Sequence, residues 1–352
     1  MKMKINMTKL LLLTLMLVAS SNMWAYDFVV DNLRYNQKSA NEVWVTTLSE
    51  NSGIRYEGEF VVPEEVVYQG TTYKVTGVEE GAFALCDNLT SVTLGNNVKI
   101  LGDNSFDRSR NLAKVVLGNS VEKIGNKAFY DCKLITSIQI PETVTEIGES
   151  AFVGTSITSI VIPDKVTTLG SNIFTSCEKL EWVKIGKGVT TISEYMFNSC
   201  NALKSIVLPD NVKTIARASF AKTGIEIAYL GKGVTNIERT AFSGCSSLKT
   251  VYSAATPPAT VDEKTFTSTN IASINLVVPT GSKSAYQSAS VWKDFGTITE
   301  MDNIETANIQ QFNIQSNMQG IYDMTGRQLP AMQKGLNIVK MSNGKTRKVV
   351  VK

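Results

Sequence analysis

The chain has 352 residues, of which 43% are hydrophobic, so it can build a large core and is not a disordered chain. It contains no histidine, which excludes Ser-His-Asp and Cys-His nucleophiles and every histidine metal site. Once residues 1–25 are removed, basic and acidic residues balance at 32 each, which argues against a nucleic-acid partner.

Residues 1–25 have the pattern of a secretory signal peptide. Three lysines precede a short apolar run, Leu10 to Ala19, which is too short to span a bilayer. Small residues follow, and cleavage is expected after Ser21 or Ala25. No later segment could form a transmembrane helix. The sequence therefore predicts an exported protein, located outside the cell or on its outer surface rather than in the periplasm.

Residues 75–250 contain a repeat of 22 or 23 residues that is centred on phenylalanine. A period of this length predicts a stacked solenoid of about eight coils. Valine stands eight residues before each phenylalanine, and Val, Leu or Ile stands five before it. The phenylalanines are Phe83, Phe106, Phe129, Phe152, Phe174, Phe197, Phe220 and Phe242.

After each phenylalanine the sequence predicts a short strand that ends at Pro or Gly. Ile138 and Ile140, for example, are two residues apart, which places both side chains on one inner face. All five cysteines stand three residues after phenylalanine, where other repeats have Ser or Thr. Such a position favours a small buried group, so we interpret the cysteines as structural thiols, with no metal site.

The residues that alternate with the inner ones point outward and form two rows across the strands. In the later coils these rows contain large apolar and aromatic side chains, a composition that can mark a binding surface. The alternative is that these residues merely suit a pleated sheet. The predicted ligand contacts are Trp182, Lys184, Val207, Ile227, Tyr229 and Tyr252.

The repeat, V-x-x-I-G-x-x-A-F-x-x-C-x-x-L-x-x-I-x-I-P, resembles the BspA-like class of leucine-rich repeats, which occurs in secreted and surface proteins. The resemblance covers about residues 75–300. It implies a β-rich α/β solenoid with a β-rich N-terminal cap at 26–74 and a C-terminal cap at 251–300. It also implies adhesion or recognition without catalysis, and it transfers no catalytic residue and no cofactor.

Residues 318–352, which follow a linker at 301–317, form a basic tail with seven Lys or Arg and one Asp. Their pattern predicts two β-hairpins, and Asn343-Gly344 is a strong turn signal. The tail is similar to the C-terminal sorting domains of the type IX secretion pathway of Bacteroidetes. It is short for such a domain, and the alternative is a basic β-appendage without a sorting role.

Three hypotheses about function follow. The first is a secreted or cell-surface recognition protein that binds a protein partner through the outward strand face. The second is a structural component of the envelope or matrix without a localised ligand site, and a glycan-binding module is a further alternative. The third, a carboxylate-based glycan hydrolase, would need two acids across a cleft, which a solenoid face does not offer. The sequence thus favours a protein that is not an enzyme.

Overall fold

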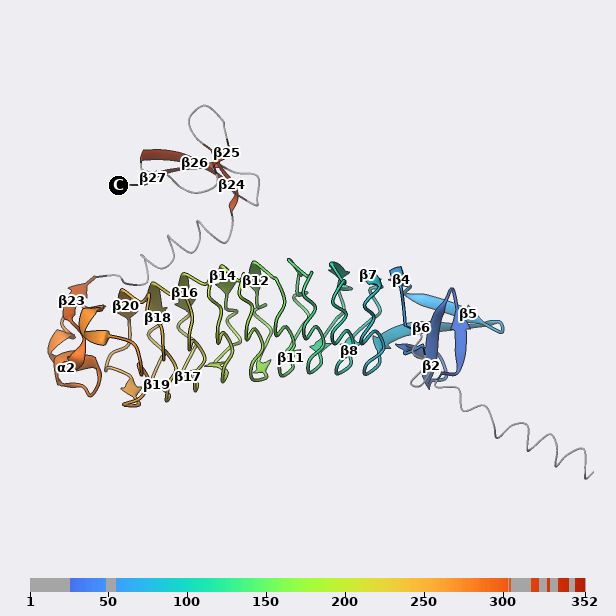
Figure 1. Ribbon diagram of the computed structural model, residues 1–352, viewed down its shortest axis with the longest axis horizontal. Coiled ribbons are helices and arrows are strands. Elements are labelled where there is room, and N and C mark those ends of the chain that lie inside the picture. The colour runs from blue at the N-terminus through green and yellow to red at the C-terminus, as the bar shows by residue number, and fades with distance from the viewer. Residues whose placement is uncertain are drawn as a thin grey trace, which may run out of the picture.

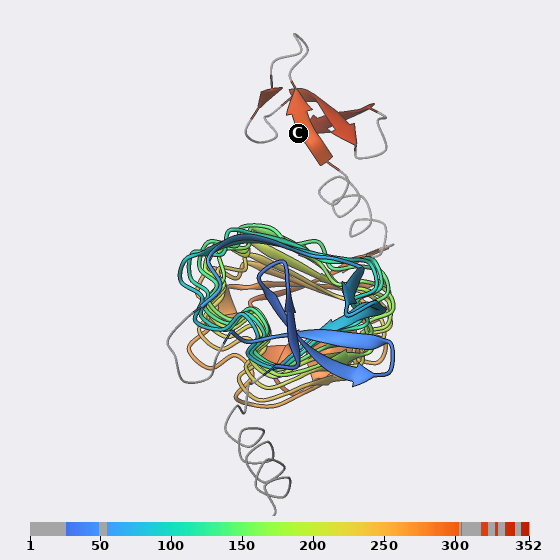
Figure 2. The same cartoon turned by 90° about the vertical axis from the view of Figure 1, so that its right-hand side faces the viewer.

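The computed structural model describes residues 26–48, 55–302 and 304, together with the backbone of four strands between 318 and 351. The predicted signal peptide and residues 303 and 305–317 of the predicted linker lie outside the described residues. The body is an elongated stack of about ten turns with a cap at each end (Figure 1). Viewed along the stack, the successive coils superpose (Figure 2).

The N-terminal cap is made of strands. β1 (Phe28–Val30), β2 (Leu33–Ser39) and β3 (Glu42–Thr46) form an antiparallel meander, and β3 pairs in parallel with β6 (Thr71–Val78). β5 (Glu65–Tyr68) forms a hairpin with β6. The cap therefore supplies the first strand on which the repeats stack.

Each coil contributes a two-residue strand to a first parallel ladder, which begins on β6 and is interrupted once, between residues 169 and 191. The residue that ends these strands is the Ile, Leu or Val five before phenylalanine, and it faces the core. The strands are β8 (Ile100–Leu101), β10 (Lys123–Ile124), β11 (Glu146–Ile147), β13 (Thr168–Leu169), β15 (Thr191–Ile192), β17 (Thr214–Ile215), β19 (Asn236–Ile237) and β21 (Thr260–Val261). A glycine follows the first four of these strands, where the coils touch closely. A Cβ on Gly148 would lie 2.5 Å from the Asn126 nitrogen.

The second ladder holds the longer strands and runs along the other side of the coil, where Figure 1 shows them in one row. Its strands are β4 (Gly58–Val62), β7 (Leu89–Leu94), β9 (Lys114–Val116), β12 (Ser159–Val161), β14 (Trp182–Lys184), β16 (Ser205–Leu208), β18 (Ile227–Leu230), β20 (Thr250–Ser253), β22 (Asn275–Pro279) and β23 (Thr297–Met301). All described pairings among them are parallel.

The phenylalanines form one buried column through the stack. From Phe83 to Phe266, neighbouring ring centroids lie 5.0 to 5.6 Å apart and the rings are nearly parallel. Phe266 adds a ninth member to the eight predicted from the sequence. Tyr56 tilts against Phe83 at one end, and Phe295 meets Phe266 edge-on at the other. These rings close the column inside the caps.

The side chain at the cysteine position, three residues after phenylalanine, makes a hydrogen bond to a backbone carbonyl group. The Sγ of Cys132, Cys177, Cys200 and Cys245 contacts the carbonyl oxygen of the phenylalanine in the preceding coil at 3.0 to 3.2 Å. Ser109 donates its hydroxyl to the Phe83 carbonyl in the same way. All five cysteines are buried and unbonded to one another. The structure thus agrees with structural thiols and explains why Ser can share the position. Thr155 and Thr223 donate instead to the phenylalanine carbonyl of their own coil.

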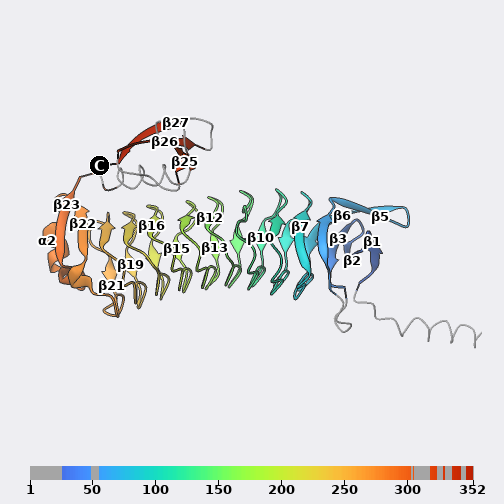
Figure 3. The same ribbon diagram turned by 45° about the horizontal axis from the view of Figure 1, so that its top comes forward.

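The C-terminal cap covers the last coils with short helices, which Figure 3 shows at the end opposite β1 to β3. They are α2 (Lys283–Ser288) and two 3-10 turns, Ile271–Ser273 and Trp292–Asp294. Tyr286 and Trp292 are fully buried under them. The Trp292 indole donates to the Ala259 carbonyl at 2.8 Å, so a polar group inside the cap is satisfied.

The tail forms a separate antiparallel sheet in the order β25-β24-β26-β27. Its strands are β24 (Met318–Tyr322), β25 (Gln328–Leu329), β26 (Gly335–Met341) and β27 (Thr346–Val351). Both predicted hairpins are present, and β24 joins them by pairing with β26. The Asn343-Gly344 turn itself lies outside the described residues. The predicted fold class, a β-rich solenoid with caps and a small β tail, is confirmed.

Candidate functional site

The second ladder presents two outward rows of side chains, which we call the outward strand face. Register places Ser159 beside Trp182, and Ser205 beside Ile227 and then Thr250. The other row places Val161 beside Lys184, and it continues in the later sheet as Val207, Tyr229, Tyr252 and Val277. Both rows agree with those deduced from the period of two.

The predicted contacts form two groups instead of one. Val207, Ile227, Tyr229 and Tyr252 lie on strands of one hydrogen-bonded sheet, β16 to β23. Trp182 and Lys184 lie on β14, which pairs with β12 in a separate sheet. The sheet is thus interrupted between β14 and β16.

The aromatic part of the face is a stacked tyrosine pair. The rings of Tyr229 and Tyr252 lie 4.3 Å apart with an angle of 18° between them. The prediction that Tyr229 is exposed is wrong, because its neighbours in the parallel ladder flank the ring and only 4% of its surface is accessible. Burial raises the pKa of the Tyr229 hydroxyl to about 12, and Tyr252 adds to the shift.

The other five predicted contacts are half-buried: Trp182, Lys184, Val207, Ile227 and Tyr252. Each lies in an outward row and keeps part of its surface accessible. These side chains therefore remain available as contacts, with Tyr229 as the support on which the Tyr252 ring rests.

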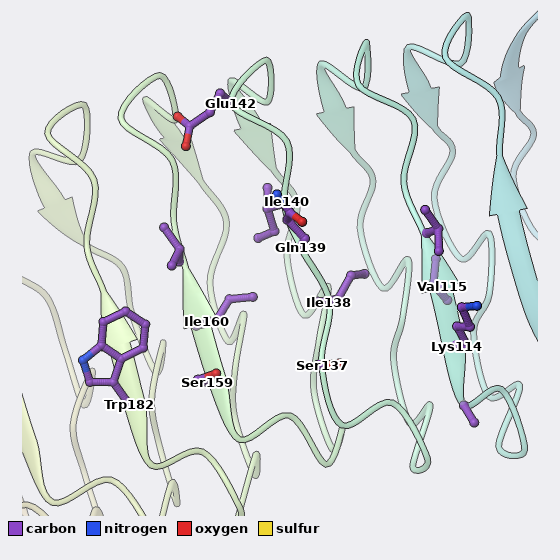
Figure 4. A pocket seen from close by; sticks show the side chains of 13 residues that line it. Lys114, Val115, Ser137, Ile138, Gln139, Ile140, Glu142, Ser159, Ile160 and Trp182 are labelled. Carbon is purple, nitrogen blue, oxygen red and sulfur yellow. The ribbon is translucent and has the colours of Figure 1, made fainter. Parts of the chain in front are cut away.

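A hollow of about 570 Å³ lies on the same face, between β9 and β14. Figure 4 shows the side chains around it, with the Trp182 indole at one end and Lys114 at the other. Ser137, Gln139 and Ser159 line it between these ends. The hollow therefore combines an aromatic surface with hydroxyl, amide and ammonium groups.

The backbone at the centre of the hollow is not paired. Residues 137–140 form no strand, and within the described chain their N–H and C=O groups make no backbone hydrogen bond. The ladder is therefore open between Val116 and Ser159. Because exposed backbone donors and acceptors are strong hydrogen-bonding groups, this segment offers partners for a ligand as well as for water.

The lining of the hollow contains two charged side chains, Lys114 and Glu142. Glu142 is the one carboxylate among the residues lining the hollow, so the paired acids of a glycosidase are not present there. Across the described residues, no three His, Cys, Asp or Glu side chains gather as a metal site. The described helices are all too short to cross a membrane.

Sequence reasoning placed Ser137, Gln139 and Ser159 in the outward rows but did not single them out as ligand contacts. The repeat pattern at 137–140 is the same as in neighbouring coils, so no signal in the sequence marks the opening of the ladder. The hollow arises from the position of the backbone, which the pattern of side chains does not specify.

The architecture defines a class of protein before any comparison, a capped parallel β-solenoid. The model of the BspA type leucine rich repeat region matches residues 69–181 and 168–292. The chain therefore belongs to the BspA-type leucine-rich-repeat family. Proteins of this family are commonly scaffolds for protein interaction without enzymatic activity.

Solved structures of bacterial leucine-rich repeat proteins are similar to this chain, and the first of the two below supports the fold. A leucine-rich repeat protein from Bacteroides ovatus is 24% identical, with a TM-score of 0.56, covering 78% of this chain and 77% of that one. The T. pallidum leucine-rich repeat protein TpLRR is 23% identical, with a TM-score of 0.48, covering 63% and 90%. No curated protein matches this sequence.

Proposed function

We propose that this is an exported recognition protein of the cell surface that binds a protein partner through the outward strand face. The observation that carries the proposal is the hollow between β9 and β14, with unpaired backbone at its centre and Trp182 at its end. An extended polypeptide would supply both the hydrogen bonds and the apolar side chains that this face can accept. The half-buried Tyr252 would extend the contact into the later coils.

Alanine variants of the aromatic contacts test this proposal. The mature chain, residues 26–352, is used to capture partners from host extracellular proteins and from envelope extracts. Trp182→Ala and Tyr252→Ala should each weaken binding by about 30-fold, because removal of an aromatic anchor costs about 2 kcal/mol. Tyr195→Ala is the matched control, since Tyr195 packs against Arg217 away from the outward strand face. Unchanged binding by both variants would contradict the proposal.

A glycan is the second candidate ligand, and the composition of the hollow is the observation that favours it. The indole of Trp182 offers a flat ring for a sugar, and Ser137, Gln139 and Ser159 offer hydrogen bonds to hydroxyl groups. A glycan array distinguishes the two candidates. Binding of a defined glycan that Gln139→Ala abolishes, with no protein captured, would favour the glycan.

A structural role in the envelope is the third candidate function.

For the tail, residues 318–352, we propose a role as an export signal. The tail forms a compact β-sheet of its own, with a net charge of +6. Deletion of residues 318–352 should trap the protein in the periplasm and leave the repeats folded. Normal amounts of the deletion variant at the cell surface would contradict the sorting role.

A further inference from the structure

The charge of the mature chain is divided between its two ends. Residues 26–80, which we call the acidic cap, contain ten Asp or Glu and four Lys or Arg, a net charge of −6. Residues 81–317 contain 21 of each sign. The tail, residues 318–352, has a net charge of +6. The whole acidic excess thus lies at one end of the solenoid, and the whole basic excess is attached to the other.

Two of the four bases of the acidic cap make contacts within it, which leave its net charge unchanged. Lys38 Nζ lies 2.5 Å from a Glu79 carboxylate oxygen, and the Arg34 guanidinium lies over the Tyr26 ring. Glu59, Glu65 and other acidic side chains of the cap are exposed. The surface of the cap is therefore predominantly negative.

The acidic cap also exposes apolar side chains. Val29, Val61 and Val67 are 44%, 69% and 61% accessible, and they are three of the eight exposed large hydrophobic residues in the described chain. Exposed apolar side chains that lie among charged ones are typical of a protein interface. The tail offers a complementary sequence, because β27 contains Arg347 and Lys348 followed by three valines.

We propose that the basic tail of one copy docks on the acidic cap of a second copy, which gives head-to-tail assembly. Opposite charges bring the two surfaces together, and the valines of the cap are then covered. Such a contact joins two different surfaces, so each copy keeps one free cap and one free tail. The assembly can therefore extend along the solenoid axis.

The length of the chain disfavours the same contact within one copy. Ten strand spacings separate β4 from β23, which is about 48 Å at ~4.8 Å each. The covalent length of residues 303–317 limits their reach to about 50 Å. Reaching its own cap would require a nearly straight linker, whereas a second copy can approach freely.

Sedimentation velocity on the mature chain, residues 26–352, tests the proposal. Association should increase with protein concentration at an ionic strength of about 0.01 M, where screening extends over ~30 Å. It should be lost at about 1 M, where screening extends over ~3 Å. A monomer at every concentration and low salt would overturn the proposal, as would a compact species that is independent of concentration.

Charge reversal identifies the two surfaces. The cap variant carries Glu59→Lys and Glu65→Lys, whose side chains accept no hydrogen bond within the described part. The tail variant carries Arg347→Glu and Lys348→Glu. Each variant alone should associate about tenfold more weakly, because each loses attraction between exposed charges. The control Glu149→Lys and Glu178→Lys makes the same charge change outside the acidic cap and should associate like the unaltered chain.

Mixing the two variants gives the sharpest outcome. The intact tail of the cap variant can bind the intact cap of the tail variant, so the mixture should form dimers that do not extend further. If the mixture associates no more strongly than either variant alone, the proposal of head-to-tail pairing is overturned. If instead the unaltered chain binds anionic vesicles through its tail and does not self-associate, the tail serves a membrane surface and the proposal fails.

Discussion

The type of residue at each repeat position in this solenoid depends on the groups that it contacts in the two adjacent coils. The cysteine position shows this, because Cys200 and Ser109 use different atoms to contact the same carbonyl group of the repeat. We expect Cys200→Ser to retain the contact. Its free energy of unfolding should lie within about 1 kcal/mol of that of the original chain. Cys200→Ala should be about 1 kcal/mol less stable than the serine variant in urea unfolding. Equal stability of the two variants would show that the hydrogen bond is unimportant.

Buried titratable groups predict a loss of stability in alkali. Burial raises the pKa of Tyr56, Tyr229 and Tyr286 to about 12 and that of Cys86 to about 11. The folded chain therefore holds these protons more tightly than the unfolded chain. Their contribution is fully present below about pH 9 and is lost as pH rises towards about 12. Thermal unfolding should show this decline, and Tyr229→Phe should make it shallower.

Within one coil, the turns around phenylalanine need a left-handed backbone. The residue two after phenylalanine has a positive φ in every coil, and it is Gly154 or Gly244 in two of them. Lys222 has φ 57° at the same place. We expect Lys222→Gly to raise the free energy of unfolding by up to about 1 kcal/mol, because glycine adopts this conformation without strain. Lys213→Gly, at an exposed position without positive φ, should lower it.

Because the coil is the unit of the fold, a whole coil can be removed. Register pairs Thr191 with Thr214 and Ile192 with Ile215, so each side chain stacks on the residue 23 positions later. Deletion of residues 189–211 should give a cooperatively folded protein that is shorter by about 4.8 Å in solution scattering. Deletion of half a coil, residues 189–199, should prevent stacking. The hollow between β9 and β14 lies outside the deleted coil, so binding at the hollow should survive this deletion.

For the whole molecule, the repeat in the sequence predicted the architecture but not the place where strand pairing is lost. The Phe, Val and Ile columns follow from a period of 22 or 23 residues, and the outward rows follow from the period of two. The opening at 137–140 and the burial of Tyr229 depend on how far neighbouring coils approach, which the identity of the side chains does not determine. The ninth coil was missed because Phe266 follows Phe242 at a longer interval than the earlier phenylalanines.

The most direct test of the proposed binding face is hydrogen exchange on residues 26–352 with and without a captured partner. Residues 137–140 lack backbone partners, so their amides should exchange quickly in the free protein. Bound partner should slow exchange there and along β12 and β14, beside Trp182. Protection confined to the phenylalanine turns or the caps, with fast exchange persisting at 137–140, would contradict the assignment of the outward strand face.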